Sequence, residues 1–319
     1  MTQRDLPPSA SPDVTVSVVI PTRDRRELLV KALRSVLAQR SIDLQVVVVD
    51  DGSSDGSEDA VIASGDARVR VLRHDVPRGV AVARNAGARA ATGSWLAFLD
   101  DDDLWAPDKL ARQVQAATEA RAAWAYAGAV EIDDRGEILG GTPPPVPATL
   151  VSELKRMNPM PAGSSNVLVE TTSFRSVDGF DERLRHLADW DLWLRLAGAA
   201  GAPAWVPEPF VAYRLHASQA TLDTHGMMAE GRLLRERHGI DLNSVRRWLA
   251  WSHLRRGDRA AAALVYATAA AAGDVVSLGR AAVASLHPRP TALARRGGDD
   301  MAWARSAADW IQAAMAAPR

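Results

Sequence analysis

The sequence predicts an α/β fold with a mostly parallel central sheet, flanking helices and a helical extension at the C-terminus. Three observations predict it. Strand patterns alternate with amphipathic helices over the first hundred residues, polar clusters follow the strand ends, and the chain becomes rich in alanine and arginine beyond Met227. Sheets of this kind bind ligands beyond the carboxyl ends of their strands, which is where the unusual residues fall.

The first hundred residues contain four predicted strands, each a short apolar run rich in β-branched residues. The strands cover residues 14–20, 44–49, 69–72 and 95–99, and helices are predicted over 24–39 and 80–91. Pro21 ends the first strand, and Gly93 is expected to cap the second helix. Strand–helix–strand order favours parallel pairing of these strands.

The rest of the chain predicts a hairpin, two further strands and several helices. Strands are expected over 123–132, 165–170 and 205–215, and helices over 189–199, 227–238, 244–255, 259–272 and 301–317. Residues 133–136 form the expected hairpin turn, and the Pro-rich stretch 142–147 an expected loop. Two prolines in 205–215 suit an edge strand.

Composition excludes several classes of protein. The 319 residues carry a net charge of −1, without the basic excess of a nucleic-acid-binding protein, and they contain no cysteine for disulfides or thiolate metal sites. The N-terminus lacks a signal-peptide pattern, and the apolar stretch 260–273 is too short to span a bilayer and is expected to be a buried helix. We therefore expect a cytoplasmic protein with at most peripheral membrane contact.

Four consecutive aspartates, Asp100 to Asp103, follow the strand 95–99 without a spacer. A charge run is usually a solvated loop, but this run cannot leave the sheet edge, so a bound cation is favoured. Carboxylate oxygens suit Mg²⁺ or Mn²⁺. The interpretation requires aspartates that share one cleft and are not already neutralised by fixed arginines.

A second acidic pair, Asp50 and Asp51, ends the strand 44–49. A calcium loop is excluded because its twelfth position, Ile62, is not glutamate. An ordinary turn explains the glycine and serines that follow but not two adjacent carboxylates, one of which can bind a base or a ribose. The motifs G-x-G-x-x-G and G-x-x-x-x-G-K-[ST] are missing, which argues against nicotinamide and P-loop enzymes.

Seven ordered motifs resemble glycosyltransferase family 2. They are VSVVIPTRDR from Val16, VVVDDGSSD from Val47, ARNAG from Ala83, FLDDDD from Phe98, GFDE from Gly179, ADWDLWLRL from Ala188 and YRLH from Tyr213. The resemblance covers about residues 14 to 220 and implies the Rossmann-like GT-A fold and an inverting, nucleotide-sugar-dependent transferase. The C-terminal hundred residues carry no such signature.

The resemblance also implies roles by position. The nucleotide-sugar-binding residues would be Pro21, Thr22, Arg23, Asp24, Asp50, Asp51, Arg84, Asn85, Asp100 and Asp101. Asp100, Asp102 and His216 would hold Mn²⁺ or Mg²⁺, with Asp102 preferred as the direct ligand.

Asp189 would be the catalytic base, kept ionised by the positive end of its helix, and a plain N-cap is the alternative. Asp191 is the second candidate for the catalytic base, because Ala188 occupies a position where the family commonly has a polar residue. Positions two apart on a helix differ by about 200° around its axis, so only one of these aspartates can face the acceptor.

The implied activity moves a sugar from a nucleotide-diphosphate sugar, UDP-sugar first, to an acceptor with the help of a divalent metal. The acceptor stays open: a glycan, a lipid-linked sugar, a natural product or a peptide. A sugar-nucleotide nucleotidyltransferase and a non-catalytic carbohydrate- or nucleotide-binding module are the alternatives. No nucleic-acid partner is expected.

We expect three regions along the chain. They are a flexible N-terminus (1–13), a catalytic domain (14–225, nucleotide-binding to about 105 and acceptor-binding from about 106) and a helical region (226–319). The helical region can bind the acceptor, form a homo-oligomer or touch a membrane surface, and the sequence does not decide among these roles.

Overall fold

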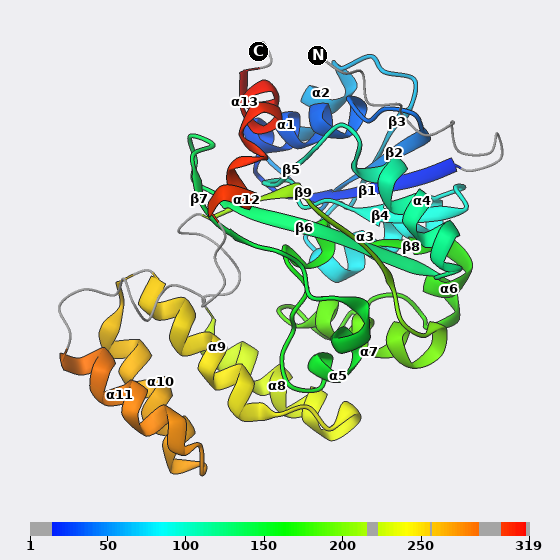
Figure 1. Cartoon of the computed structure of the whole chain (residues 1–319). Helices are drawn as coiled ribbons and strands as arrows, with labels where there is room; N and C mark the ends of the chain where they lie inside the picture. The colour runs from blue at the N-terminus through cyan, green and yellow to red at the C-terminus, as the bar shows by residue number, and fades with distance from the viewer. Residues whose placement is uncertain (1–14, 216–222, 256, 287–300, 317–319) are drawn as a thin grey trace.

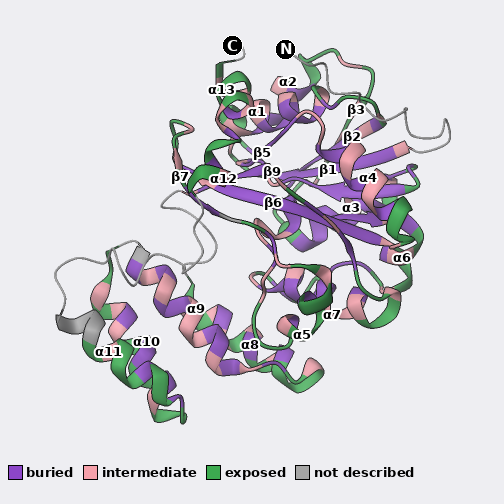
Figure 2. Cartoon of the chain, viewed as in Figure 1, coloured by how far each residue is buried: buried purple, intermediate pink, exposed green. Residues whose placement is uncertain are grey.

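The computed structural model describes residues 15–215, 223–255, 257–286 and 301–316. Within these residues, a nine-stranded sheet forms the centre, helices cover both of its faces, and an arm of helices projects from one side (Figure 1). Buried residues concentrate in the sheet and in the helix faces that pack on it, whereas residues 275–282 at the end of the arm are mostly exposed (Figure 2). The expected α/β class with a helical extension is confirmed.

The N-terminal half contains four parallel strands connected by helices. The strands are β1 (Thr15–Thr22), β2 (Asp43–Asp50), β3 (Val69–Arg73) and β4 (Trp95–Phe98), and the helices are α1 (Arg26–Leu37), α2 (Ser57–Ile62) and α3 (Val80–Ala90). Their order in the sheet is β3-β2-β1-β4, with every pair parallel as expected. The acidic residues that follow β2 and β4 therefore lie at the same sheet edge as the end of β1.

The middle of strand β1 is mainly apolar because its side chains pack into two cores. Val18 and Ile20 pack on one side of the sheet and Val19 on the other, all fully buried. Gly87 of α3 lets that helix approach closely, since a Cβ there would lie 2.3 Å from a methyl group of Val19. Burial on both faces is why this strand lacks polar alternation.

Gly93 does not cap α3, contrary to expectation. The helix ends at Ala91 in an extended conformation. A Cβ at Gly93 would lie 2.6 Å from the carbonyl oxygen of Thr15. Glycine is needed there for close approach to β1, which a local sequence pattern cannot distinguish from a helix cap.

The second half makes the sheet mixed rather than mostly parallel. Its strands are β5 (Leu104–Trp105), β6 (Trp124–Ile132), β7 (Ile138–Thr142), β8 (Leu168–Glu170) and β9 (Ala204–Arg214). β8 is antiparallel to both β4 and β6, β7 forms the expected hairpin with β6, and β9 is parallel to β6.

β9 is not the edge strand that its prolines suggested, because it lies between β6 and the short β5. Its register against β6 shifts between Val206 and Val211, the stretch that contains Pro207 and Pro209. Proline cannot donate a ladder hydrogen bond, so this irregularity accommodates both prolines inside the sheet.

Helices in this half complete the layers over the sheet. They are α4 (Lys109–Ala120), α5 (Pro147–Leu154), α6 (Thr171–Ser176) and α7 (Ala188–Ala200), with a 3₁₀ turn, η1, at Gly163–Ser165. α5 is an addition to the sequence prediction, and it begins at Pro147, the last residue of the expected loop. Proline suits the first turn of a helix because the missing N–H would have no partner there.

The helical extension has two parts. The arm consists of α8 (Thr224–His238), α9 (Leu242–Arg255), α10 (Arg259–Ala271) and α11 (Val275–Leu286). The expected helix 301–317 is instead two helices, α12 (Met301–Arg305) and α13 (Ala308–Ala316), which return to the sheet at β6 and β7 (Figure 1). Trp303 packs where Gly128 leaves room, since a Cβ at Gly128 would lie 2.4 Å from its ring.

α10 is only partly the buried helix expected over 260–273. Val265 and Tyr266 are buried, whereas Leu264 is 68% exposed. Among the described helices, none is both long and apolar enough to cross a membrane.

Candidate active site at the sheet edge

A cleft of about 1130 Å³ opens at the sheet edge beyond the carboxyl ends of the N-terminal strands. Nine of the predicted site residues line it: Pro21, Thr22, Arg23, Asp51, Arg84, Asp100, Asp101, Asp102 and Asp189. Four others, Asp24, Asp50, Asn85 and Asp191, are not among its lining residues, and His216 lies outside the described residues. The structure therefore gathers most of the predicted site in one place.

The acidic run at the end of β4 is held by arginines. Arg25 contacts Asp101 at 3.1 Å and Asp102 at 2.5 Å, and Arg84 pairs with Asp100. The hydroxyl of Thr22 donates to Asp101 at 2.7 Å. Burial raises the pKa of Asp101 to about 7, with Asp102 adding to the effect and Arg25 opposing it. The aspartates share one cleft as required, but the requirement that no arginine neutralise them is not met.

The residues only partly fit a divalent metal. The carboxylates of Asp100 and Asp102 are of the donor type that Mg²⁺ and Mn²⁺ prefer, and both residues line the cleft. The described residues contain no cluster of three or more histidine, cysteine or acidic side chains placed to hold an ion. Binding would also require Arg25 or Arg84 to give up its contact with these carboxylates.

Asp103 and Arg214 hold the acidic loop 100–103 in place through hydrogen bonds on the side away from the cleft. Asp103 is fully buried, accepts a hydrogen bond from the backbone N–H of Arg214 at 3.0 Å, and has a pKa that burial raises well above its ordinary value. The guanidinium of Arg214 donates to the carbonyl oxygens of Asp102 at 3.0 Å and Asp133 at 2.7 Å. The fourth aspartate of the run is thus part of the scaffold.

Asp50 and Asp51 have different surroundings although they are adjacent. Asp50 is fully buried, pairs with Arg73 and accepts from the N–H of Ser53 at 2.7 Å. Asp51 reaches the cleft and accepts from His74 at 2.7 Å and from the N–H of Gly79 at 2.8 Å. Burial alone would raise the pKa of Asp51, but these hydrogen bonds and those from the Arg78 N–H outweigh it, so the pKa is lowered.

Of the two predicted residues that follow β1, Asp24 holds a loop in place and Arg23 lines the cleft. Asp24 has a left-handed backbone, with φ of 52°, and its carboxylate accepts from the N–H of Ser54 at 2.7 Å. It therefore fixes the loop after β2 against the loop after β1. Arg23 is exposed and lines the cleft.

Arg84 and Asn85 are neighbours on α3 that serve different cavities. Arg84 lines the cleft, and its buried Nε has no hydrogen-bond partner among the described residues. The amide of Asn85 instead binds the backbone of Phe180, donating to its carbonyl oxygen at 2.8 Å and accepting from its N–H at 3.0 Å. Gly179 has φ of 65°, and a Cβ there would lie 2.7 Å from the Asn85 amide oxygen. Asn85 thus positions the GFDE loop.

Asp189 lies in the first turn of α7 and lines the cleft. Its carboxylate accepts from the N–H of Trp190 at 2.7 Å and lies 3.4 Å from the amide nitrogen of Asn158. A Cβ at Gly163 would lie 2.6 Å from this carboxylate, so glycine keeps the space beside it open.

Burial raises the pKa of Asp189, and Asp100 adds to the effect, whereas Arg84 and the Trp190 N–H oppose it. Desolvation thus raises the pKa even though Asp189 lies in the first turn of α7, where the positive end of the helix is expected to favour the ionised form. The N-cap residue of α7 is Leu187, so Asp189 is not a plain N-cap.

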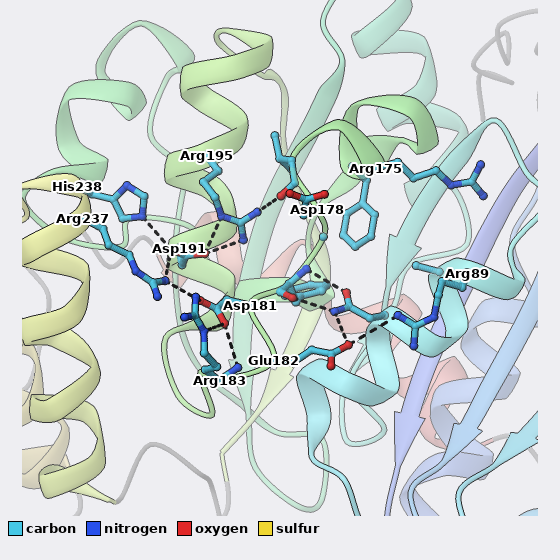
Figure 3. Close-up of a pocket in the computed structure, with 16 residues that line it drawn as sticks. Arg89, Arg175, Asp178, Asp181, Glu182, Arg183, Asp191, Arg195, Arg237 and His238 are labelled. Atoms are coloured by element: carbon cyan, nitrogen blue, oxygen red, sulfur yellow. Dashed lines mark hydrogen bonds and ion pairs between the residues drawn. The ribbon is translucent and has the colours of Figure 1, made fainter.

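Asp191 belongs to a second cavity, of about 540 Å³, shown in Figure 3. It is 1% exposed, and its carboxylate contacts Arg195 at 2.6 Å and His238 at 2.8 Å. In the same cavity Asp181 pairs with Arg183 and Arg237 (Figure 3). The second candidate for the catalytic base is therefore a structural ion-pair residue that does not face the cleft.

Sequence reasoning missed several residues of the cleft. His186 lines it three positions before Asp189, and its Nε2 lies 3.3 Å from Asp223. Trp248 and Trp251 line it from α9, in the region where the sequence offered no motif. A tryptophan pair three residues apart on one helix face was the available signal.

Comparisons with known proteins agree with this geometry. Residues 17–172 match the family described as glycosyl transferase family 2. The chain is 41% identical over 116 residues to the succinoglycan biosynthesis protein ExoO of Rhizobium meliloti, a match that covers 36% of this chain and 33% of ExoO. It is 29% identical over 184 residues, 58% of this chain and 70% of the relative, to the Escherichia coli UDP-Glc:alpha-D-GlcNAc-diphosphoundecaprenol beta-1,3-glucosyltransferase WfgD.

Solved structures show the same fold. The S. aureus TarS structure in complex with UDP-GlcNAc matches with a TM-score of 0.54 at 19% identity, covering 74% of this chain and 71% of that one. The mannosyltransferase PcManGT of Pyrobaculum calidifontis, in complex with GDP-Man and Mn²⁺, matches with a TM-score of 0.52 at 19% identity, covering 98% and 89%. Residues 17–172 are thus similar to glycosyl transferase family 2, and the chain has the GT-A fold.

Proposed function

We propose that this protein transfers a sugar from a nucleotide-diphosphate sugar to an acceptor hydroxyl with inversion, using Asp189 as general base. The observation that carries the proposal is the environment of Asp189. It shares the cleft with Asp51, Arg84 and Asp100, yet the hydrogen bonds described for it come from neutral groups. A carboxylate without a fixed cation is able to accept a proton.

UDP-sugars are the first donors to test. WfgD is named for UDP-Glc, and TarS was solved with UDP-GlcNAc. The PcManGT complex holds GDP-Man, which makes that donor the natural comparison. Asp51 and Arg84 would lie on the nucleotide side of the cleft, where the buried Nε of Arg84 is a donor suited to a diphosphate oxygen.

The proposed step is a single displacement. The acceptor oxygen attacks the anomeric carbon while Asp189 takes its proton, and the bond from that carbon to the diphosphate breaks through an oxocarbenium-like transition state. The nucleoside diphosphate leaves with the bonding electron pair. Arg84 and Arg25 would stabilise its negative charge from the cleft wall.

Metal use is part of the proposal. Asp100 and Asp102 would hold Mn²⁺ or Mg²⁺, which as a Lewis acid would neutralise charge on the departing diphosphate. Arg25 and Arg84 would then turn from these carboxylates toward the diphosphate.

The test is incubation with UDP-Glc, UDP-GlcNAc and GDP-Man in separate reactions, each with Mn²⁺, with Mg²⁺ and with a chelator. Release of nucleoside diphosphate supports the transferase. Release of pyrophosphate from sugar phosphate and UTP indicates a nucleotidyltransferase, and nucleotide binding without turnover indicates a binding module. Activity that a chelator abolishes and Mn²⁺ restores supports the metal site, whereas unchanged activity assigns diphosphate neutralisation to Arg25 and Arg84.

A further inference from the structure

The wall of the cleft changes character away from the sheet edge. Near the ends of β1, β2 and β4 it is charged, with Asp51, Arg84 and the acidic run. One part of the remaining wall comes from β6, β9 and residues 185–188 and includes Glu131, Arg185 and His186, and the other part comes from β7, from the segment after α5, and from α8 and α9. This second part, the apolar wall, has mainly aliphatic and aromatic side chains: Leu139, Met157, Met160, Met227, Val245, Trp248 and Trp251.

Two of these side chains face solvent. Leu139 is 48% and Met157 is 37% exposed, and both line the cleft. Among the polar groups of the cleft, the Asn158 amide lies 3.4 Å from Asp189 and the hydroxyl of Ser244 donates to Asp241 at 2.8 Å, whereas the Ser164 hydroxyl has no partner among the described residues. Leu139 and Met157 form an exposed apolar part of this wall, which suits the apolar part of a ligand.

The position of Asp189 connects the two walls. Its carboxylate lies 3.4 Å from Asn158 on the apolar side, and the charges of Arg84 and Asp100 on the other side influence its pKa. A molecule whose hydroxyl reaches Asp189 therefore has Asn158 and its apolar neighbours Met157 and Met160 on one side.

From this geometry we infer that the acceptor is amphiphilic: a hydroxyl-bearing head that reaches Asp189 and an apolar tail that packs against Met157, Leu139 and the tryptophans of α9. The inference rests on the proposed function, because it names the acceptor class for the same site. A purely polar oligosaccharide would leave Leu139, Met157 and Met160 without contacts that favour it over water.

The experiment uses alkyl glucosides as probes, with the full chain saturated with UDP. Affinities of methyl, n-butyl, n-hexyl and n-octyl β-D-glucoside are measured by calorimetry below micelle-forming concentrations, and phenyl β-D-glucoside tests an aromatic tail. The dissociation constant is expected to fall roughly threefold for each methylene that becomes buried. Heat-capacity changes should be negative, the signature of apolar burial.

Leu139→Gln and Met157→Gln test the wall itself. Each should weaken n-octyl glucoside binding several-fold, leave methyl glucoside unchanged and leave the melting temperature unchanged, because both side chains are partly exposed. The matched control is Leu264→Gln, the same substitution at an exposed leucine of α10 that does not line the cleft. It should change none of these values.

Two results would overturn the inference while the proposed function stands. One is equal affinity for methyl and octyl glucoside with intact UDP binding. The other is affinity that grows with the number of glucose rings, from methyl glucoside to cellotriose, instead of with tail length. Absence of UDP binding in the unmodified protein would remove the proposed function, and the inference with it.

Discussion

Asp189 and Asp191 stand two residues apart on α7 and lie in two different cavities. Asp191 is held by Arg195 and His238, so its charge is compensated inside the protein (Figure 3). Asp189 is hydrogen-bonded to neutral groups, and burial raises its pKa. The comparison teaches that a rotation of about 200° on one helix separates a carboxylate held by ion pairs from a carboxylate that lines the cleft.

Asp189→Asn should give the largest effect. Loss of the base is expected to lower kcat about 10³-fold, because general-base catalysis typically contributes 10²- to 10⁴-fold. Thermal stabilisation by UDP should remain. Measuring turnover and UDP-induced shifts in melting temperature checks both parts, and turnover near that of the unmodified protein would remove Asp189 from the mechanism.

Asp191→Asn should instead lower stability. It leaves the Arg195 cation without its carboxylate and the His238 ring without its partner, and breaking a buried pair of this kind costs about 3 kcal/mol. Denaturant unfolding measures this loss. Below the melting temperature kcat should stay within a few-fold of normal, and a selective loss of kcat in a well-folded variant would return Asp191 to the catalytic site.

The pH dependence should distinguish the pair further. Asp189 must be ionised to accept a proton, so kcat should rise with pH through its raised pKa, above the ordinary value of 3.8. Because the folded-state pKa exceeds the unfolded one, Asp189 contributes stability below the unfolded pKa that is lost as pH rises through the folded pKa. Asp189→Asn should therefore be at least as stable as the unmodified protein at neutral pH. A lower melting temperature there would contradict this account of its burial.

Arg183→Gln should have the smallest effect. Arg183 pairs with Asp181 in the second cavity, but its side chain is 75% exposed, and Arg237 also holds Asp181. Exposed ion pairs contribute little. Melting temperature and turnover should stay within experimental error, and a measurable loss in either would assign this cavity a role beyond stability.

The strands and helices of the N-terminal half could be predicted because short, continuous sequence segments specify them. The valine-rich run from Val16 to Ile20 specifies a strand buried on both faces, and the acidic residues directly after β2 and β4 fix the location of the site. Helical periodicity correctly separated Asp189 from Asp191, since only one of them faces the cleft.

The ion pairs between residues far apart in the sequence could not be predicted from the sequence. Arg25 lies 76 positions before Asp101, and no local pattern indicates that the two meet. The same holds for α9, whose tryptophans reach the cleft only through the tertiary arrangement of the arm. α11 escaped prediction because its first residues, Val275 and Val276, have low helix propensity.

The arm α8–α11 follows β9, and the chain then returns to the same region of the sheet, where Trp303 docks on Gly128. The arm is thus inserted between two segments, β9 and α12, that both pack in the same region of the sheet. Buried side chains of the arm, among them Met227, Leu234 and Leu249, belong to the same hydrophobic core as Val19 and Phe98 of the sheet. Deleting the arm would therefore expose apolar surface of the sheet to water, so a truncated protein ending at β9 should aggregate.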